Sequence, residues 1–152
     1  MFRVPMLQQL DEQSAFNKTF CYYWSYPSSN ADIGAAHSAE LMFVFDLRCV
    51  GTKSAFNGTN NSDEIYDTVQ QMWTNFARCG NPSTDNVEWK AYSADDQNVL
   101  VIAGPGDLRI EQGLLTEQYK AVLHLVNYYQ FMDKYFTPAY LLGVIAEREQ
   151  NS

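Results

Sequence analysis

The sequence is poor in basic residues and contains no long hydrophobic run. Ten Lys and Arg stand against eighteen Asp and Glu, which gives a net charge of −8. A nucleic-acid-binding surface needs positive charge, and so does a surface that binds an anionic membrane. The longest apolar runs, Leu41–Phe45 and Tyr140–Ala146, are much shorter than the ~20 residues of a membrane helix. We therefore expect neither nucleic acid nor a membrane as a partner.

Cysteine is scarce as well, and the three residues, Cys21, Cys49 and Cys79, form no CxxC pair. An odd number without that spacing does not describe a disulfide framework. We expect three buried thiols, with one bridge plus a free thiol as the alternative. Met1–Pro5 shows no charged region followed by an apolar stretch, so no secretory signal is visible. The localisation stays open, since a parent protein could be secreted or cytoplasmic.

The chain does contain enough apolar material for a packed core. Its 152 residues are 46% hydrophobic and 14% aromatic, and the length is that of one ordinary domain. Asn61–Cys79 predicts an amphipathic helix that Gly80 and Pro82 end. Leu115–Tyr135 predicts a second long helix, which we expect to pack on its own sheet. The expected apolar stripes are Ile65, Val69, Met72, Trp73 and Phe76 on the first helix and Tyr119, Val122, Leu123, Val126 and Tyr129 on the second.

Two short segments have the pattern of strands. Phe20–Tyr26 alternates between two largely apolar faces, which suits a strand covered on both sides, and Val99–Ile102 is a short buried strand. Further elements are a helical turn or two within His37–Phe45, a surface loop at Thr52–Asn61 and a last helix from Pro138 to about Arg148. So few strands are thin for a free-standing sheet, and the chain looks like part of something larger.

Histidine, the commonest general base, occurs only twice. His124 lies beside the apolar stripe of the second long helix, and we interpret it as a surface residue. His37 lies in a loop-like context directly after a predicted buried strand. Because α/β folds place working residues in loops at strand ends, His37 is the candidate functional histidine.

Two motifs around it resemble a known family. Gly34–Phe45 reads GAAHSAELMFVF, which resembles the catalytic-histidine segment of type B carboxylesterases, G-x-x-H-x-x-E-L/I-x-F/Y-V/L-F. Met72–Pro82 reads MWTNFARCGNP, which is similar to the W-x-N-F-A-R-x-G-x-P segment of the same carboxylesterase, cholinesterase and para-nitrobenzyl esterase group. Trp89 and Tyr92 fit the W-x-x-Y that follows. The resemblance covers about residues 2–102.

The resemblance implies an α/β-hydrolase fold and serine-esterase chemistry. His37 would take the proton from a serine as it attacks an ester carbonyl, and would then return it to the leaving alcohol. In α/β-hydrolases the histidine is the last triad member along the chain, after the serine and the acid. Glu40 would be a supporting carboxylate near the triad and not its acid. No metal or organic cofactor is implied.

The other parts of such a site are absent from the sequence. No G-x-S-x-G motif and no Gly-Gly run for an oxyanion hole occurs in the 152 residues, and the family's acidic triad member belongs upstream of this region. Since the triad works as a unit, we expect the chain to be inactive without an N-terminal part, and whether it is an enzyme by itself stays open.

We therefore interpret residues 1–152 as the C-terminal segment of a single α/β-hydrolase domain, incomplete alone. It would hold late strands of the central sheet plus C-terminal helices. Its function would be to supply the triad histidine of a carboxylic-ester hydrolase acting on a small-molecule ester. The alternatives are a non-catalytic cholinesterase-like binding or adhesion module, or an inactive truncated remnant. Self-association through exposed sheet edges or C-terminal helices is left open.

Two other chemistries have weaker support in the sequence. His37, Glu40 and Cys49 do not have the ligand spacing of a zinc site. Neither Cys21 nor Cys49 lies in a recognisable nucleophile context. The aromatic residues Trp24, Phe43 and Phe45 would belong to the core or to a pocket wall.

Overall fold

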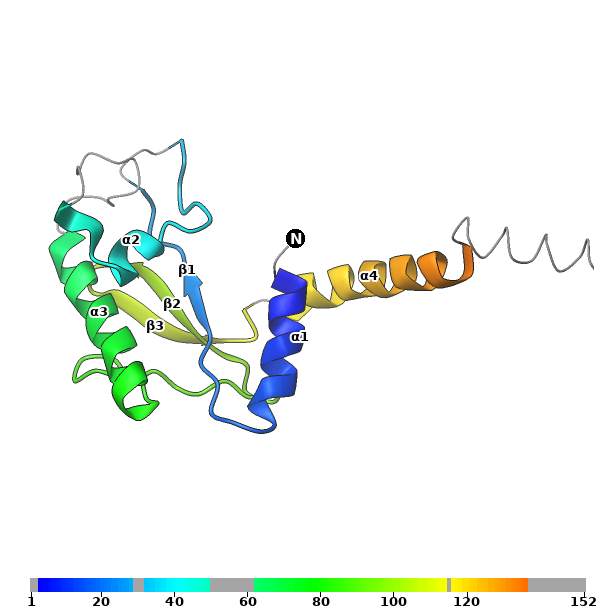
Figure 1. Cartoon of the computed structure of the whole chain (residues 1–152), viewed down its shortest axis with the longest axis horizontal. Helices are drawn as coiled ribbons and strands as arrows, with labels where there is room; N and C mark the ends of the chain where they lie inside the picture. The colour runs from blue at the N-terminus through cyan, green and yellow to red at the C-terminus, as the bar shows by residue number, and fades with distance from the viewer. Residues whose placement is uncertain (1–2, 29–31, 50–61, 115, 137–152) are drawn as a thin grey trace, which may run out of the picture. The chain divides into compact units, whose positions relative to one another are not determined.

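The computed structural model describes residues 3–28, 32–49, 62–114 and 116–136. They fall into two compact units, one made of Gln9–Leu114 and the other of the chain before Gln9 together with the chain from Leu115 on. The elements in chain order are α1 (Arg3–Ser14), β1 (Tyr22–Trp24), α2 (Leu41–Val44), the 3₁₀ helix η1 (Leu47–Cys49), α3 (Ser62–Cys79), β2 (Asn98–Gly104), β3 (Asp107–Gln112) and α4 (Thr116–Phe136) (Figure 1). None of the described helices is both long and apolar enough to cross a membrane.

The three strands form one sheet in the order β1-β2-β3. β1 runs parallel to β2, with Tyr22 opposite Leu100 and Trp24 opposite Ile102. The strand expected over Phe20–Tyr26 is therefore shorter than predicted. Ser25 and Tyr26 both direct their N–H groups to the same Ile102 carbonyl, at 2.9 and 3.0 Å, so the regular ladder ends there.

β2 and β3 form an antiparallel hairpin, and β3 was not expected. The turn uses Gly106 at φ +69°, a conformation that glycine adopts without strain. Along β3, half-buried Leu108 and Ile110 alternate with exposed Asp107 and Arg109. This period of two is the signal that would have identified the strand.

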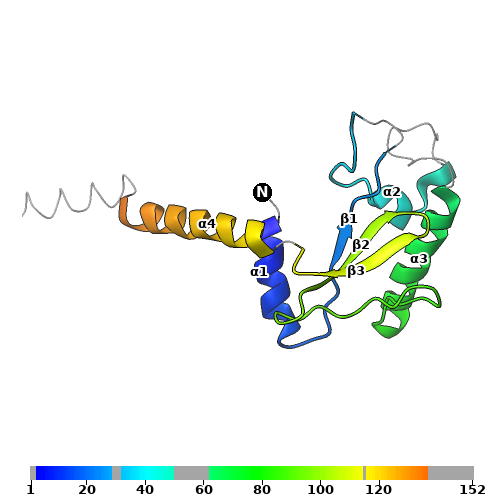
Figure 2. The same ribbon diagram turned by 180° about the vertical axis from the view of Figure 1, so that it is seen from behind.

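One face of the sheet is covered by α2 and α3 (Figures 1 and 2). Leu100 and Ile102 of β2 are fully buried on this face. They pack with a stripe of α3 that is also fully buried and with several aromatic side chains: Ile65, Val69, Met72, Tyr66, Phe43 and Trp89. Burying an apolar side chain of this size stabilises a fold by about 1.5–3 kcal/mol, so this face holds the main core.

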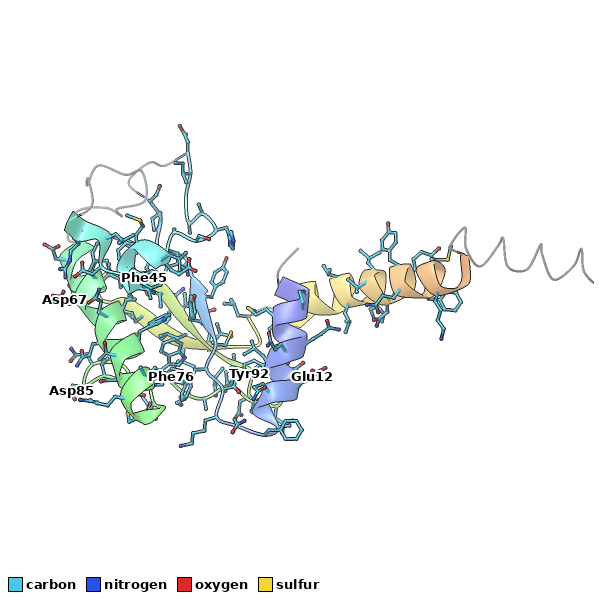
Figure 3. All side chains as sticks on the ribbon, in the orientation of Figure 1. Glu12, Phe45, Asp67, Phe76, Asp85 and Tyr92 are labelled. Atoms are coloured by element: carbon cyan, nitrogen blue, oxygen red, sulfur yellow. The ribbon has the colours of Figure 1, made fainter. Side chains whose placement is uncertain are left out.

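The opposite face carries a smaller cluster. Cys21, Tyr92 and Val99 are buried there, with Leu10 of α1 packed against them. The Tyr92 hydroxyl donates to the Asp11 carboxylate over 2.6 Å, and Figure 3 shows Tyr92 beside α1. A sheet covered on both faces is what the two apolar faces of the first strand predicted.

The bounds of the first long helix were predicted to within one residue. α3 ends at Cys79, and Gly80 follows at φ +70° with its N–H bonded to the Phe76 carbonyl over 2.8 Å. Three of the five expected stripe residues, Ile65, Val69 and Met72, are fully buried. Trp73 is half-buried, and Phe76 is 49% exposed, so the prediction of a buried stripe is wrong at its C-terminal end.

The second long helix is confirmed as an element, because α4 spans Thr116–Phe136. Its expected apolar stripe is not a buried one. Val122 is 43% exposed and Tyr129 is 70% exposed, while Leu123 and Val126 are half-buried. The loop predicted at Thr52–Asn61 and the last helix predicted from Pro138 lie outside the described residues.

Candidate active site

The loop that carries His37 follows β1 and folds back on itself. The buried Ser28 donates its N–H to the Gly34 carbonyl over 2.9 Å, which closes the first part of the loop. Gly34 has φ +60°, so a residue without a Cβ suits this position. The chain then passes through turns to α2. Working residues of parallel sheets lie in such loops, beyond the carboxyl ends of the strands.

His37 is exposed on a turn that two backbone hydrogen bonds hold. Ala39 N–H donates to the Ala36 carbonyl over 3.2 Å, and Leu41 N–H donates to the Ser38 carbonyl over 3.2 Å. Ser38, the next residue after His37, has φ 68°. This left-handed conformation costs a non-glycine residue roughly 1–2 kcal/mol, and such local strain is often found at functional sites.

Glu40, three residues after His37, connects the loop to β1. The Tyr22 hydroxyl donates to Glu40 Oε1 over 3.5 Å, a long hydrogen bond. Tyr22 is fixed by ring contacts with Trp73 and Trp89, at centroid distances of 5.3 and 6.2 Å. Burial, followed by the charge of Glu40, raises the pKa of Tyr22 to about 12. The phenol therefore stays protonated and remains a donor at neutral pH.

α2 is anchored on its inner side by Phe43. This ring is buried, stacks on Tyr66 at 4.3 Å between centroids and contacts the ring of Trp24 at 4.8 Å. Gln70 of α3 also donates to the Phe43 carbonyl over 3.4 Å. Phe43 therefore belongs to the core, and Trp24 packs at its margin. Of the two roles that the sequence left open for these residues, core or pocket wall, the structure shows the first.

A cluster of charges holds the chain after α2. Arg48 donates to both oxygens of Asp46, over 2.6 and 2.8 Å, and reaches Asp67 of α3 over 3.1 Å. Its guanidinium lies over the Tyr66 ring at 5.1 Å. Hydrogen bonding to Arg48 lowers the pKa of the Asp46 carboxyl. This network ties η1 to α3 and so fixes the far end of the histidine segment.

The outer side of α2 is apolar and exposed. Leu41 is 42% exposed, and Phe45, which directly follows α2, is 67% exposed; Figure 3 labels Phe45 beside α2. Ile33 in the same loop is 38% exposed. Phe45 therefore does not belong to the core of this chain. Ile33, Leu41 and Phe45 are thus exposed apolar side chains in the segment that also carries His37.

The cysteines differ from the expectation of three buried thiols. Cys21 is buried, but Cys79 is exposed, and both are free; the side chain of Cys49 lies outside the described residues. Burial raises the pKa of Cys21 to about 11, which makes it a poor nucleophile because the thiolate is the reactive form. Across the described ranges, no three His, Cys, Asp or Glu residues gather where they could hold a metal ion. His124 is exposed on α4, as predicted.

The sequence interpretation missed two residues of this site. Tyr22 was assigned to a strand without a role, although it is the partner of Glu40. Its position 18 residues upstream leaves no local signal, since the contact arises from the fold. Ser38 was not singled out because a left-handed backbone at serine has no sequence signature.

The fold and this loop define the class of protein. Over 76% of the chain, the structure superimposes on thermophilic and other para-nitrobenzyl esterase structures with TM-scores of 0.66 and 0.62, at 24 and 25% identity. The sheet and its helices are thus part of an α/β-hydrolase fold. The chain covers 24% of the first of these structures and 23% of the second.

The sequence comparisons then give the family. The model of the carboxylesterase family matches residues 1–122, and the chain belongs to this family. It is 29% identical over 104 residues to the para-nitrobenzyl esterase of Bacillus subtilis (strain 168), covering 67% of this chain and 21% of the relative. It is 34% identical over 92 residues to a medium-chain fatty acyl-CoA hydrolase precursor of Anas platyrhynchos, and this match covers 56% of this chain and 16% of the relative. The chain thus spans about a fifth of the length of these relatives.

Proposed function

We propose that this chain supplies the triad histidine, His37, to a carboxylic-ester hydrolase of the serine-esterase type. His37 acts as general base toward a serine hydroxyl and then as general acid toward the leaving alcohol. Water repeats the sequence on the acyl-serine and releases the carboxylic acid. The serine, the triad acid and the oxyanion hole come from outside the 152 residues, either from the rest of a longer polypeptide or from a partner chain.

The observation that carries this proposal is the place of His37 in a carboxylesterase-family chain. It is an exposed imidazole in the loop that follows a parallel strand, and the family match extends over this whole segment. The two relatives described above are an esterase and a hydrolase by name. The substrate proposed for the completed protein is accordingly a small-molecule ester.

Glu40 has a supporting role in this proposal. Its carboxylate is held by the Tyr22 hydroxyl and lies on the same turn as His37. The hydrogen bond from Tyr22 to Glu40 ties the turn that carries His37 to β1. Glu40 is a positioning residue in this scheme, and the triad acid is a different carboxylate.

The test uses a hybrid polypeptide in which this chain replaces the matching region of the Bacillus subtilis para-nitrobenzyl esterase. We expect the hybrid to hydrolyse p-nitrophenyl acetate and the isolated chain not to do so. His37→Ala should lower kcat/KM at least about 10³-fold, as loss of a triad member does. His124→Ala is the matched control, because it removes an exposed histidine from α4, and it should leave turnover unchanged.

The outcomes separate the proposal from its alternative. A folded hybrid in which His37→Ala keeps its turnover would contradict the role of His37. A folded hybrid without any turnover would favour the non-catalytic binding or adhesion module. Folding is checked independently by circular dichroism and by gel filtration.

A further inference from the structure

The segment between α1 and β1 holds a pattern that the serine-esterase chemistry does not use. Asn17-Lys18-Thr19 reads N-x-T, the acceptor pattern for a glycan on asparagine. Asn57 and Asn60 stand in two further N-x-S/T patterns, and both lie outside the described residues. The eleven asparagines of the chain give about one such pattern by chance. The surroundings of Asn17 therefore decide whether it can carry a glycan.

Two anchors fix the backbone around Asn17. The N–H groups of Phe16 and Asn17 both donate to the Gln13 carbonyl, over 3.1 and 3.0 Å, which extends the last turn of α1. On the other side, Tyr92 N–H donates to the Thr19 carbonyl over 2.7 Å, and the two residues form an isolated antiparallel bridge. The acceptor pattern therefore lies on a defined corner, drawn in blue between α1 and β1 in Figure 1.

The side chains of this corner are placed as an acceptor site needs them. Asn17 is exposed, and its side-chain amide makes no hydrogen bond within the described residues. The Thr19 hydroxyl donates to the Asn17 carbonyl over 3.1 Å, so the asparagine and the threonine lie on the same turn. Lys18 between them is exposed as well. A glycan on Asn17 would therefore break no hydrogen bond of the described fold.

Asn81 supplies a contrast within the same chain. Asn81-Pro82-Ser83 has the outer residues of the pattern with a proline between them, and proline in the middle excludes glycosylation. The Asn81 side-chain oxygen also accepts the Ser83 N–H over 3.0 Å, so this asparagine closes a turn. Of the two asparagines, Asn17 alone has both the acceptor pattern and an unengaged amide.

The surface beside Asn17 is apolar. Phe16 is 82% exposed, the largest exposed fraction of any large apolar side chain in the described ranges. Asn17 also lines a cavity of about 340 Å³, whose wall includes Phe20 and Phe76. Exposed apolar surface of this kind ordinarily has a role or a cover, and a glycan is bulky and solubilising. A glycan attached at this corner would cover the neighbouring phenyl ring.

We propose that Asn17 is a site of N-linked glycosylation and that its glycan shields Phe16. In the transfer, Asn17 Nδ2 forms a bond to C1 of the reducing-end sugar of a lipid-linked oligosaccharide. The bond between that carbon and the lipid diphosphate breaks, the lipid diphosphate leaves, and Nδ2 loses a proton. The proposal includes passage of the chain through the compartment where this transfer occurs. It does not rest on the proposed function, because it needs neither His37 nor a serine.

The test uses the protein isolated from its source with an antibody against this chain. Peptide N-glycosidase in heavy-oxygen water converts a glycosylated asparagine into an aspartate that carries the heavy isotope, and mass spectrometry of the peptides locates it. We expect the isotope at position 17 and not at Asn81. An Asn17 recovered as unmodified asparagine would overturn the proposal. So would equal labelling of Asn17 and Asn81, since that pattern reports spontaneous deamidation.

Two substitutions of Thr19 test whether the pattern itself directs the modification. Thr19→Ala removes the hydroxyl that the pattern requires, and Thr19→Ser keeps one; neither changes the backbone carbonyl that Tyr92 bonds. In cells that make the glycosylated protein, Thr19→Ala should lower the occupancy of Asn17 at least about 10-fold, whereas Thr19→Ser should remain glycosylated. Equal occupancy in the two variants would overturn the assignment. Circular dichroism checks that both variants fold.

Limited proteolysis with chymotrypsin tests the shielding. Chymotrypsin cleaves after exposed aromatic residues, and the bond that follows Phe16 leads directly to Asn17. Cleavage at this bond should be at least about 10-fold slower in the glycosylated protein than in Asn17→Gln, because the glycan blocks access to an exposed segment. Cleavage after Phe45, which is 67% exposed, is the control and should not change. Equal rates after Phe16 in the two proteins would overturn the shielding.

Discussion

The two long helices, α3 and α4, have similar sequence patterns and different surroundings. Each was predicted from apolar residues at helical spacing, and each forms. In α3 the stripe residues Ile65, Val69 and Met72 are fully buried against the sheet. In α4 the stripe residues Val122 and Tyr129 are 43% and 70% exposed, and Leu123 and Val126 are half-buried.

The difference shows what an apolar period can and cannot predict. Apolar residues at helical spacing predict that a helix forms, because this spacing is a local property of the sequence. Burial needs a partner surface, and α3 has one in the same compact unit, the face of β2 with Leu100 and Ile102. The contributions of the two helices to stability should therefore be unequal, and substitutions can measure this.

The largest effect is expected in the core of α3. Met72→Ala removes a side chain with 0% exposure that packs on the sheet, so it should lower the free energy of unfolding by about 2–5 kcal/mol. Urea denaturation followed by tryptophan fluorescence measures the change. A loss below about 1 kcal/mol would mean that the α3 side of the core is loosely packed and that the contrast with α4 is wrong.

The opposite face of the sheet gives the next effect, through Cys21. Because burial raises its pKa from 9.0 to about 11, the folded chain keeps a proton that the unfolded chain loses in this range. The contribution of Cys21 to stability is therefore constant below about pH 9 and falls by roughly 2–3 kcal/mol as the pH rises to about 11. Unfolding in urea across this range should show the decline, and Cys21→Ala should reduce its slope. Cys79→Ala, at an exposed thiol, is the control; an unaltered slope in Cys21→Ala would refute the assignment.

A smaller effect is expected where α3 ends. Gly80 has φ +70°, and a Cβ there would meet no atom within 4 Å, so substitution costs only the left-handed backbone. Gly80→Ala should destabilise by about 1 kcal/mol and Gly80→Asn by less. Thermal unfolding of the three proteins should rank them in this order. The same melting temperature for all three proteins would show that the left-handed backbone at position 80 does not affect stability.

The smallest effect is expected on α4. Leu125→Ala shortens a side chain that is 57% exposed, and it should change the free energy of unfolding by no more than about 0.5 kcal/mol. The same urea assay applies, with Met72→Ala as the reference. A cost near that of Met72→Ala would mean that Leu125 is buried in solution, and the difference between the two helices would disappear.

Much of the fold could be predicted because its signals are local. The helix of α3, its stop at Gly80 and the buried strand with Leu100 and Ile102 all follow from spacing, turn chemistry and apolar runs. α1 was missed because its sequence has no marked apolar stripe, although Leu10 packs on the sheet. β3 was missed because its alternation of Leu108 and Ile110 is short and follows a turn.

The candidate site was predictable only where a motif marks it. The roles of His37 and Glu40 were predicted from the resemblance of the segment Gly34–Phe45 to a carboxylesterase motif, and for His37 also from its place in a loop after a strand. Tyr22 was not predictable, since its contact with Glu40 joins residues 18 positions apart, and only the fold brings them together. The burial of Phe43 and the exposure of Phe45 also depend on which side of α2 faces α3. The sequence does not reveal this orientation, because the two residues are of the same type and lie in one segment.

The central claim is that this chain carries the general base of a serine esterase that is larger than the chain itself. The most direct measurement is to treat the cells that make the protein with a fluorophosphonate, which labels activated serines, and then to capture the protein with an antibody against this chain. We predict that the captured polypeptide or complex is several times heavier than 17.4 kDa and carries a labelled serine. Capture of a protein of 17.4 kDa with no labelled serine in it or in any bound partner would contradict the claim.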